Sequence, residues 1–147
     1  MPAIQTTYTE NMAAAVAGHV ADMRAAVMAS RECDVAIGFG VPVFQGAAVH
    51  SAKLKVNADT NTTFLGVTVR DRSVTTADAY AINETARILQ TGPIWVAASV
   101  AVAAGDQVAV TSTGVWSNVA GTNGLVIDNA RWDTSTSGAA LAKIVLK

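Results

Sequence analysis

The side chains best suited to nucleophilic or metal chemistry are few and are not spaced for either. Cys33, His19 and His50 are the only thiol and imidazole groups of the chain. A structural zinc site needs four ligands in close spacings such as C-x-x-C, and no such spacing occurs. Ser51 and Asp59 could be grouped with His50 as a serine triad, but a triad is defined by geometry and no G-x-S-x-G motif is present. We therefore predict no catalytic residue, metal or cofactor, and a small hydrolase is the least favoured function.

Three tryptophans are the remaining candidates for ligand contact, because exposed aromatic rings are suited to stacking against sugars. Trp95 lies in an apolar run, so we expect it in the core. Trp116 lies in a turn-rich stretch, and Trp132 stands between two charged residues. The sequence therefore predicts Trp116 and Trp132 as exposed aromatic residues, and a β-sandwich module that binds glycans is an alternative function.

The charge content excludes several classes of partner. Charged residues make up 14% of the 147 residues, against an average of about 25%. Ten basic and eleven acidic residues give a net charge of −1, so no field gathers nucleic acid or an anionic membrane. The Ala-rich stretch 12–29 is interrupted by Asp22 and Arg24, so we expect no membrane span there. The first residues lack the basic region of a signal peptide, so we do not expect one. A weakly charged surface is compatible with lying against other subunits, because interface centres are depleted of charge.

The elements that position these residues fall into two regions. Val16, Val20, Met23 and Val27 follow a helical rhythm within 10–31, although Gly18 disfavours a helix. We therefore expect residues 1–31 to form an N-terminal arm or a short helix.

The rest of the sequence has the pattern of short strands separated by turns. Gly105-Asp106 and Asn123-Gly124 are typical turn dipeptides between apolar runs. The predicted strands are 34–39, 41–49, 53–56, 64–71, 85–89, 93–100, 107–111, 115–119, 125–129 and 139–146. We predict a mainly β, single-domain chain, with residues 32–147 forming an antiparallel β-sandwich or small, jelly-roll-like β-barrel.

A series of short motifs in a fixed order resembles the structural cement, or decoration, proteins of tailed-phage capsids. The motifs are Val20-Ala21-Asp22, Ile37-Gly38-Phe39-Gly40-Val41-Pro42-Val43, Phe64-Leu65-Gly66-Val67-Thr68-Val69-Arg70-Asp71, Gly92-Pro93-Ile94-Trp95-Val96, Val102-Ala103-Ala104-Gly105-Asp106-Gln107-Val108, Ala130-Arg131-Trp132-Asp133-Thr134-Ser135 and the segment 141–146. Their order along nearly the whole chain is more specific than any single motif.

This resemblance implies a mostly β, non-enzymatic protein that binds the outside of an icosahedral shell and stabilises the contacts between capsomers. The implied partner is the major capsid protein of the same phage, with the cement protein itself a dimer or trimer. It also implies a place on the virion surface after assembly in the host cytoplasm, without direct contact to nucleic acid or membrane. For the capsid or subunit interface we predict the apolar residues of the N-terminal region: Ile4, Tyr8, Met12, Val16, Val20, Met23 and Val27.

Overall fold

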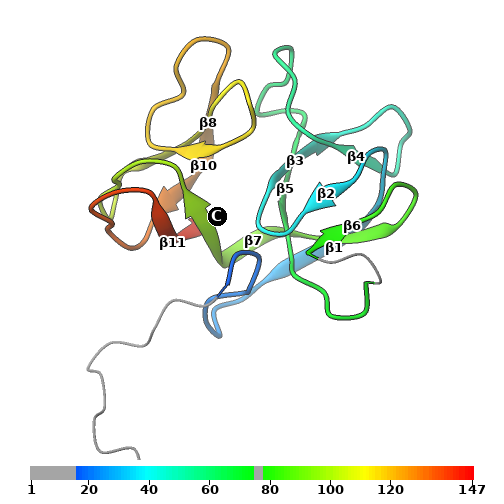
Figure 1. The fold of residues 1–147 in the computed structure, drawn as a ribbon, viewed down its shortest axis with the longest axis horizontal. Helices are drawn as coiled ribbons and strands as arrows, with labels where there is room; N and C mark the ends of the chain where they lie inside the picture. The colour runs from blue at the N-terminus through cyan, green and yellow to red at the C-terminus, as the bar shows by residue number, and fades with distance from the viewer. Residues whose placement is uncertain (1–15, 75–77) are drawn as a thin grey trace, which may run out of the picture.

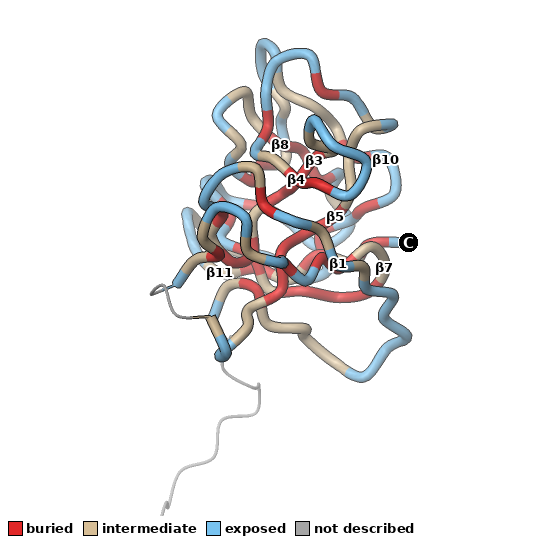
Figure 2. Tube along the Cα trace, turned by 90° about the vertical axis from the view of Figure 1, so that its right-hand side faces the viewer, coloured by how far each residue is buried: buried red, intermediate tan, exposed pale blue. Residues whose placement is uncertain are grey.

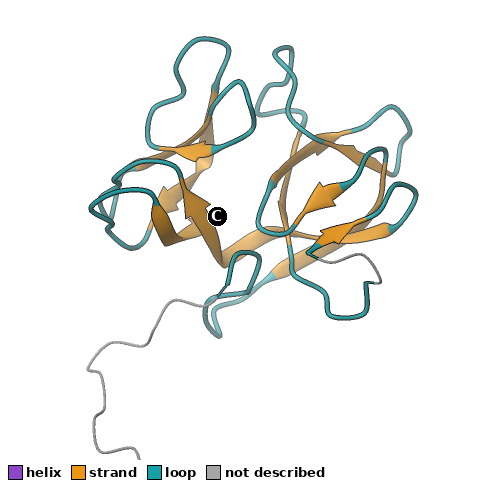
Figure 3. Ribbon diagram, in the orientation of Figure 1, coloured by secondary structure: helices purple, strands orange, loops and turns teal. Residues whose placement is uncertain are grey.

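The computed structural model describes residues 16–74 and 78–147. This part of the chain forms strands joined by loops and contains no helix, and therefore none long and apolar enough to cross a membrane (Figure 3). The strands are β1 (Val27–Cys33), β2 (Ile37–Gly38), β3 (Pro42–Gln45), β4 (Ser51–Lys53), β5 (Phe64–Thr68), β6 (Ala79–Tyr80), β7 (Thr85–Ala98), β8 (Gln107–Val110), β9 (Trp116–Ser117), β10 (Leu125–Trp132) and β11 (Ala140–Leu146). The prediction of a mainly β chain is confirmed.

Strand β7 is 14 residues long and belongs to both halves of the molecule (Figure 1). Its first half closes a ring with β1, β4, β3 and β5, and its second half closes a ring with β11, β10, β8 and β9. Parallel pairs, β1 with β4 and β7 with β9, complete the two rings. Closed barrels leave few free strand edges. Nine strands thus form two small barrels that share β7, which we call the first and second barrel, while β2 and β6 pair in a separate two-stranded sheet. Of the two predicted architectures, the small barrel agrees with this arrangement and the stacked sheets of a sandwich do not.

The alternation of apolar residues explains which faces are buried. In the second barrel, Ile94 and Val96 on β7 and Ala142, Ile144 and Leu146 on β11 all point into one core. A second core fills the first barrel. Most buried residues lie on the strands and most exposed residues lie in the loops, as Figure 2 shows. The two-residue period of β11 and of the second half of β7 therefore sets which of their side chains point into the second barrel.

Cys33 lies wholly buried in the core of the first barrel. Burial raises the pKa of its thiol to about 11, and the nearby carboxylate of Glu84 adds to that shift. The reactive thiolate is therefore scarce at neutral pH, and the side chain serves as a small apolar core residue.

The two barrels are tied together by contacts of the β4–β5 loop. The Lys55 ammonium donates to the backbone carbonyl of Asn123, at 3.2 Å. The Asn61 side chain donates to the carbonyl of Val126 at 2.9 Å and to the carboxylate of Asp128 at 3.0 Å. Because Lys55 and Asn61 belong to the first barrel and their partners to the second, these bonds hold the barrels as one body.

Candidate interface

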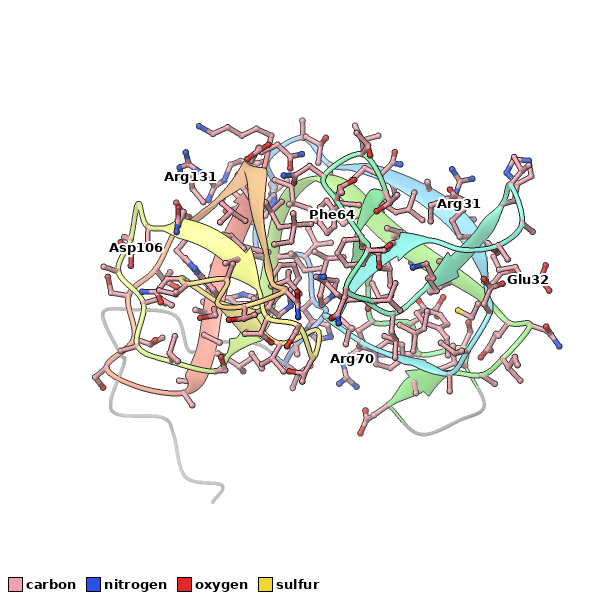
Figure 4. The ribbon with its side chains drawn as sticks, turned by 90° about the horizontal axis from the view of Figure 1, so that it is seen from above. Arg31, Glu32, Phe64, Arg70, Asp106 and Arg131 are labelled. Atoms are coloured by element: carbon pink, nitrogen blue, oxygen red, sulfur yellow. The ribbon has the colours of Figure 1, made fainter. Side chains whose placement is uncertain are left out.

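The N-terminal segment 17–21 lies between the two barrels and is hydrogen-bonded to both. The Gly18 N–H donates to the Trp95 carbonyl at 2.8 Å, and the Trp95 N–H donates to the His19 carbonyl at 2.9 Å, which adds the segment to β7. The Arg70 N–H, just after β5, donates to the Gly18 carbonyl at 2.8 Å, and Figure 4 shows Arg70 at the junction. The helix predicted within 10–31 therefore does not form over residues 16–31.

The conformation of Gly18 gives the physical reason. Its φ of +87° lies in the left-handed region, which a right-handed helix cannot contain. A Cβ at this position would lie 2.9 Å from the Cβ of Phe39 and 3.0 Å from the backbone nitrogen of Gly40. Hydrogen bonds to neighbouring strands replace the helical ones here. After a turn region, β1 begins at Val27, inside the region expected to be an arm or helix.

Four charged side chains fix the next turn of the N-terminal segment. The Asp22 carboxylate accepts bonds from both the backbone N–H and the Nε of Arg24, each at 3.0 Å. The Arg24 Nη2 also donates to Asp133 at 2.8 Å, and Lys143 Nζ lies 2.8 Å from the same carboxylate. Hydrogen bonds from Arg24 lower the pKa of Asp22, and those from Lys143 and then Arg24 lower the pKa of Asp133. This ionic cluster attaches the turn to β11 and to the end of β10.

Acid is expected to loosen this attachment. A carboxyl whose pKa is depressed in the folded protein contributes stability above its ordinary value of 3.8, and this stability is lost as the pH falls through the folded value. As the pH is lowered past about 4, the melting temperature should therefore decrease. The decrease should be smaller in Asp133→Asn, whose melting temperature is already lower at about pH 6. Thermal unfolding of both proteins from about pH 6 to pH 2 measures the difference. If the melting temperatures of the two proteins depend on pH in the same way, the ionic cluster does not contribute to the stability lost in acid.

The turn presents an apolar side chain to solvent. Met23, between the two bonded residues, is 102% exposed, and Val27 and Val16 are 53% and 46% exposed. Val20 is half-buried, packs against the core of the second barrel and bridges to Ile94. We call Val16, Met23 and Val27 the N-terminal apolar set. Three other predicted interface residues lie outside the described residues: Ile4, Tyr8 and Met12.

The prediction that Trp116 and Trp132 are exposed is wrong. They are 3% and 1% exposed, because β9 and β10 direct both rings into the core of the second barrel. The Trp116 Nε1 donates to the carbonyl of Gly40 in the first barrel at 2.7 Å. Trp95, expected in the core, is half-buried, because alternation along β7 turns its neighbours inward. The glycan-binding alternative therefore loses both of its aromatic residues.

The residues considered for nucleophilic chemistry bond to different partners. The Ser51 hydroxyl donates to Asp34 at 3.0 Å, and the Asp59 carboxylate accepts from Lys53 at 2.8 Å. The His50 Nδ1 lies 3.1 Å from a terminal nitrogen of Arg31, on β1 (Figure 4). Across residues 16–74 and 78–147, no three His, Cys, Asp or Glu side chains are placed to hold a metal ion.

Comparison with known proteins decides the family of this two-barrel chain. A family model described as structural cement protein (E217 gp24/Pam3 gp6) matches residues 4–147. The chain belongs to the structural cement protein family. The cement protein is thus a structural protein of the phage virion that binds the capsid and stabilises it, as the order of the motifs predicted.

Two solved phage structures are similar to the cement protein in fold. A chain of "The capsid of Myoviridae Phage XM1" aligns with a TM-score of 0.75 and 16% identity, covering 97% of this chain and 96% of that one. The head fiber gp8.5 N base of bacteriophage phi29 aligns with a TM-score of 0.51 and 11% identity, covering 84% of this chain and 95% of that one. A search of curated proteins finds no match.

Proposed function

We propose that this cement protein binds the outer surface of an icosahedral capsid and joins neighbouring capsomers through its N-terminal region. The partner is the major capsid protein of the same phage. The observation that carries the proposal is the turn at Met23, where an ionic cluster holds a fully exposed apolar side chain in place. Apolar groups held rigidly at a surface are typical of the anchors of protein interfaces, because little entropy is lost on binding.

Burial of the N-terminal apolar set supplies a driving force for this contact. Complete burial of a valine or methionine side chain is favourable by about 1.5–3 kcal/mol. The charges beside Met23 balance, since Asp22 and Asp133 face Arg24 and Lys143. The surface therefore suits an uncharged apolar region of the shell better than a charged one.

The rigid pair of barrels explains how one molecule could resist separation of two capsomers. Bonds across the junction fix the distance between the barrels, so contacts at different places act together. Once one contact forms, the next is intramolecular, with an effective concentration in the mM range for short connections. Binding to the assembled shell but not to its separated parts stabilises assembly by mass action.

Several finer features belong to the same proposal. Closed dimers or trimers would match shell symmetry axes and multiply the contacts. Assembly takes place in the host cytoplasm, and a position on the outer surface keeps the protein from direct contact with the packaged nucleic acid. The net charge of −1 agrees with the second of these.

Sedimentation with empty shells of the same phage tests the proposal. We expect saturable binding to assembled shells and far weaker binding to separated capsid protein at the same concentration. Equal binding to both, or binding to neither, would contradict it. Light scattering on the purified chain gives the oligomeric state.

A further inference from the structure

The loop between β9 and β10 contains the dipeptide Asn123-Gly124, and the fold favours each residue type at its position. Asn123 has a φ of +57°, in the left-handed region that asparagine enters more readily than most other residues. A Cβ at Gly124 would overlap the carbonyl oxygen of Ala120, so glycine is the residue that fits there. Figure 1 shows the loop that leads into β10 on the far side of the molecule from the N-terminal turn. The dipeptide is therefore set by the geometry of its own loop.

Asparagine followed by glycine carries a chemistry that the proposed function does not use. The backbone nitrogen of Gly124 can close a cyclic imide on the side-chain carbonyl carbon of Asn123, and glycine has no side chain to obstruct the approach. The Asn123 side chain is exposed, and in the part of the chain that the structure describes its amide has no hydrogen-bond partner. The Gly124 N–H donates to the Gly121 carbonyl at 3.4 Å, which is longer than a usual N–H···O bond. The two groups that would react are therefore held weakly.

The Lys55 ammonium acts on the peptide group between these two residues. Lys55 is 8% exposed, and its ammonium donates to the carbonyl oxygens of Val56, at 2.9 Å, and Asn123, at 3.2 Å. The Asn123 carbonyl and the Gly124 nitrogen belong to one peptide group, so a cation at the oxygen stabilises the anion that forms when this nitrogen loses its proton. Loss of that proton makes the nitrogen a nucleophile. Lys55 therefore promotes attack by the Gly124 nitrogen on the Asn123 side chain.

We propose that Asn123-Gly124 is a site of spontaneous deamidation, and that Lys55 directs the reaction to isoaspartate. The deprotonated Gly124 nitrogen bonds to the side-chain carbonyl carbon of Asn123, the C–N bond of the carboxamide breaks, and ammonia leaves with the released proton. Water then adds to one of the two carbonyl carbons of the cyclic imide and breaks the bond between that carbon and the Gly124 nitrogen, which regains a proton. Water is the co-reactant, and no oxidant or reductant takes part.

The position of Lys55 selects between the two products. Addition of water at the side-chain carbon yields aspartate, whereas addition at the backbone carbonyl carbon yields isoaspartate, in which the chain continues through the side chain. Lys55 polarises the backbone carbonyl and stabilises the negative charge that develops on its oxygen. In isoaspartate this carbonyl has become a free carboxylate beside the ammonium, and an ionised acceptor makes a stronger bond than a neutral one. The connection of the β4–β5 loop to the second barrel is thereby kept as an ion pair.

Ageing of the purified full chain tests this proposal. The natural protein and Lys55→Met are incubated folded in warm, mildly alkaline buffer, and peptide mass spectrometry with electron-transfer fragmentation measures deamidation and distinguishes isoaspartate from aspartate. Methionine has a long unbranched side chain like lysine but cannot donate to the carbonyl. We expect deamidation at Asn123 to be about tenfold slower in Lys55→Met, with a lower ratio of isoaspartate to aspartate. Asn118 is the internal control and should stay unconverted, because its side chain donates to Asp106 at 3.2 Å.

The same two proteins unfolded in urea provide the second comparison. The bond between Lys55 and Asn123 is then absent, so both proteins should convert at the same rate and with the same ratio of products. The folded natural protein should give a higher share of isoaspartate than the unfolded one, a result that does not depend on the folding of Lys55→Met. Equal shares in the folded and unfolded natural protein would overturn the proposal, as would a natural protein whose Asn123 stays unconverted. Equal or faster deamidation of folded Lys55→Met would also overturn it, because the bond would then leave the dipeptide unaffected or protect it.

Discussion

Replacing both Met23 and Val27 by aspartate is expected to weaken binding to shells about a hundredfold, without unfolding the protein. Both side chains are exposed, so the free chain loses little stability. If the shell covers them, each new carboxylate must lose its hydration in an apolar contact, and about 1.4 kcal/mol per residue is already a tenfold loss of affinity. Sedimentation of labelled protein with empty shells over a range of concentrations measures the change.

Val49→Asp is the matched control for this prediction. Val49 is 79% exposed, on the β3–β4 loop, between the exposures of Met23 and Val27, and the substitution adds one carboxylate where the double variant adds two. We expect shell affinity within about twofold of the natural chain. If the control and the double variant lose affinity equally, added negative charge alone explains the loss, and the shell contact does not include the N-terminal apolar set. Deleting residues 1–24 is a poorer test, because it removes the bonds of Gly18 and His19 to both barrels.

Gly66→Ala is expected to destabilise the protein by about 4 kcal/mol or more, or to prevent folding. Gly66 is the middle residue of β5, with a φ of +147°. A Cβ there would lie 2.1 Å from the carbonyl oxygen of Leu89 on β7, a backbone atom that cannot move without separating the two strands. Because β7 belongs to both barrels, the disturbance reaches the whole molecule. Urea unfolding followed by circular dichroism measures the loss.

Gly105→Ala provides the comparison for that loss. Gly105 also has a positive φ, +94°, but nothing lies within 4 Å of the place its Cβ would take. The free energy of unfolding should therefore decrease only by the cost of holding alanine in a left-handed backbone conformation, about 1–2 kcal/mol. Similar costs at the two sites would show that the close approach of β5 to β7 is not what requires glycine.

The strands were predictable where one face is buried and the residues alternate. β8 and β11 lie within or almost within their predicted ranges, and the apolar residues of β11 point inward as their spacing indicates. The dipeptides Gly105-Asp106 and Asn123-Gly124 lie between strands, with positive φ at Gly105 and at Asn123. The alternation and the turn dipeptides each depend only on residues that are close together along the chain, so both can be recognised in a single sequence.

The shared strand and the N-terminal segment were not predictable in the same way. Two separate strands were predicted, 85–89 and 93–100, yet β7 runs without a break from Thr85 to Ala98, with Gly92 at a φ of +125°. β1 was missed because the spacing of apolar residues in that region fits a helix, while its antiparallel partners on β7 lie more than fifty residues away along the chain. Barrel closure depends on such distant pairs.

The residues predicted for an interface show the same contrast between local and distant signals. Met23 and Val27, chosen by their type and spacing, are exposed among the described residues, and their part in a shell contact stays a prediction. Trp116 was misjudged because its burial depends on closure of the second barrel and on a bond to Gly40, 76 residues away along the chain. The ionic cluster that holds Met23 in place was missed, because Asp133 and Lys143 reach it only through the fold.

The release of packaged nucleic acid on heating tests the central claim most directly. Filled particles that lack the cement protein are heated alone, with saturating natural protein, and with the double variant at Met23 and Val27 at the same concentration. The natural protein should raise the release temperature by several degrees, and the variant should raise it far less. A release temperature that stays unchanged while the natural protein is bound would contradict a stabilising role.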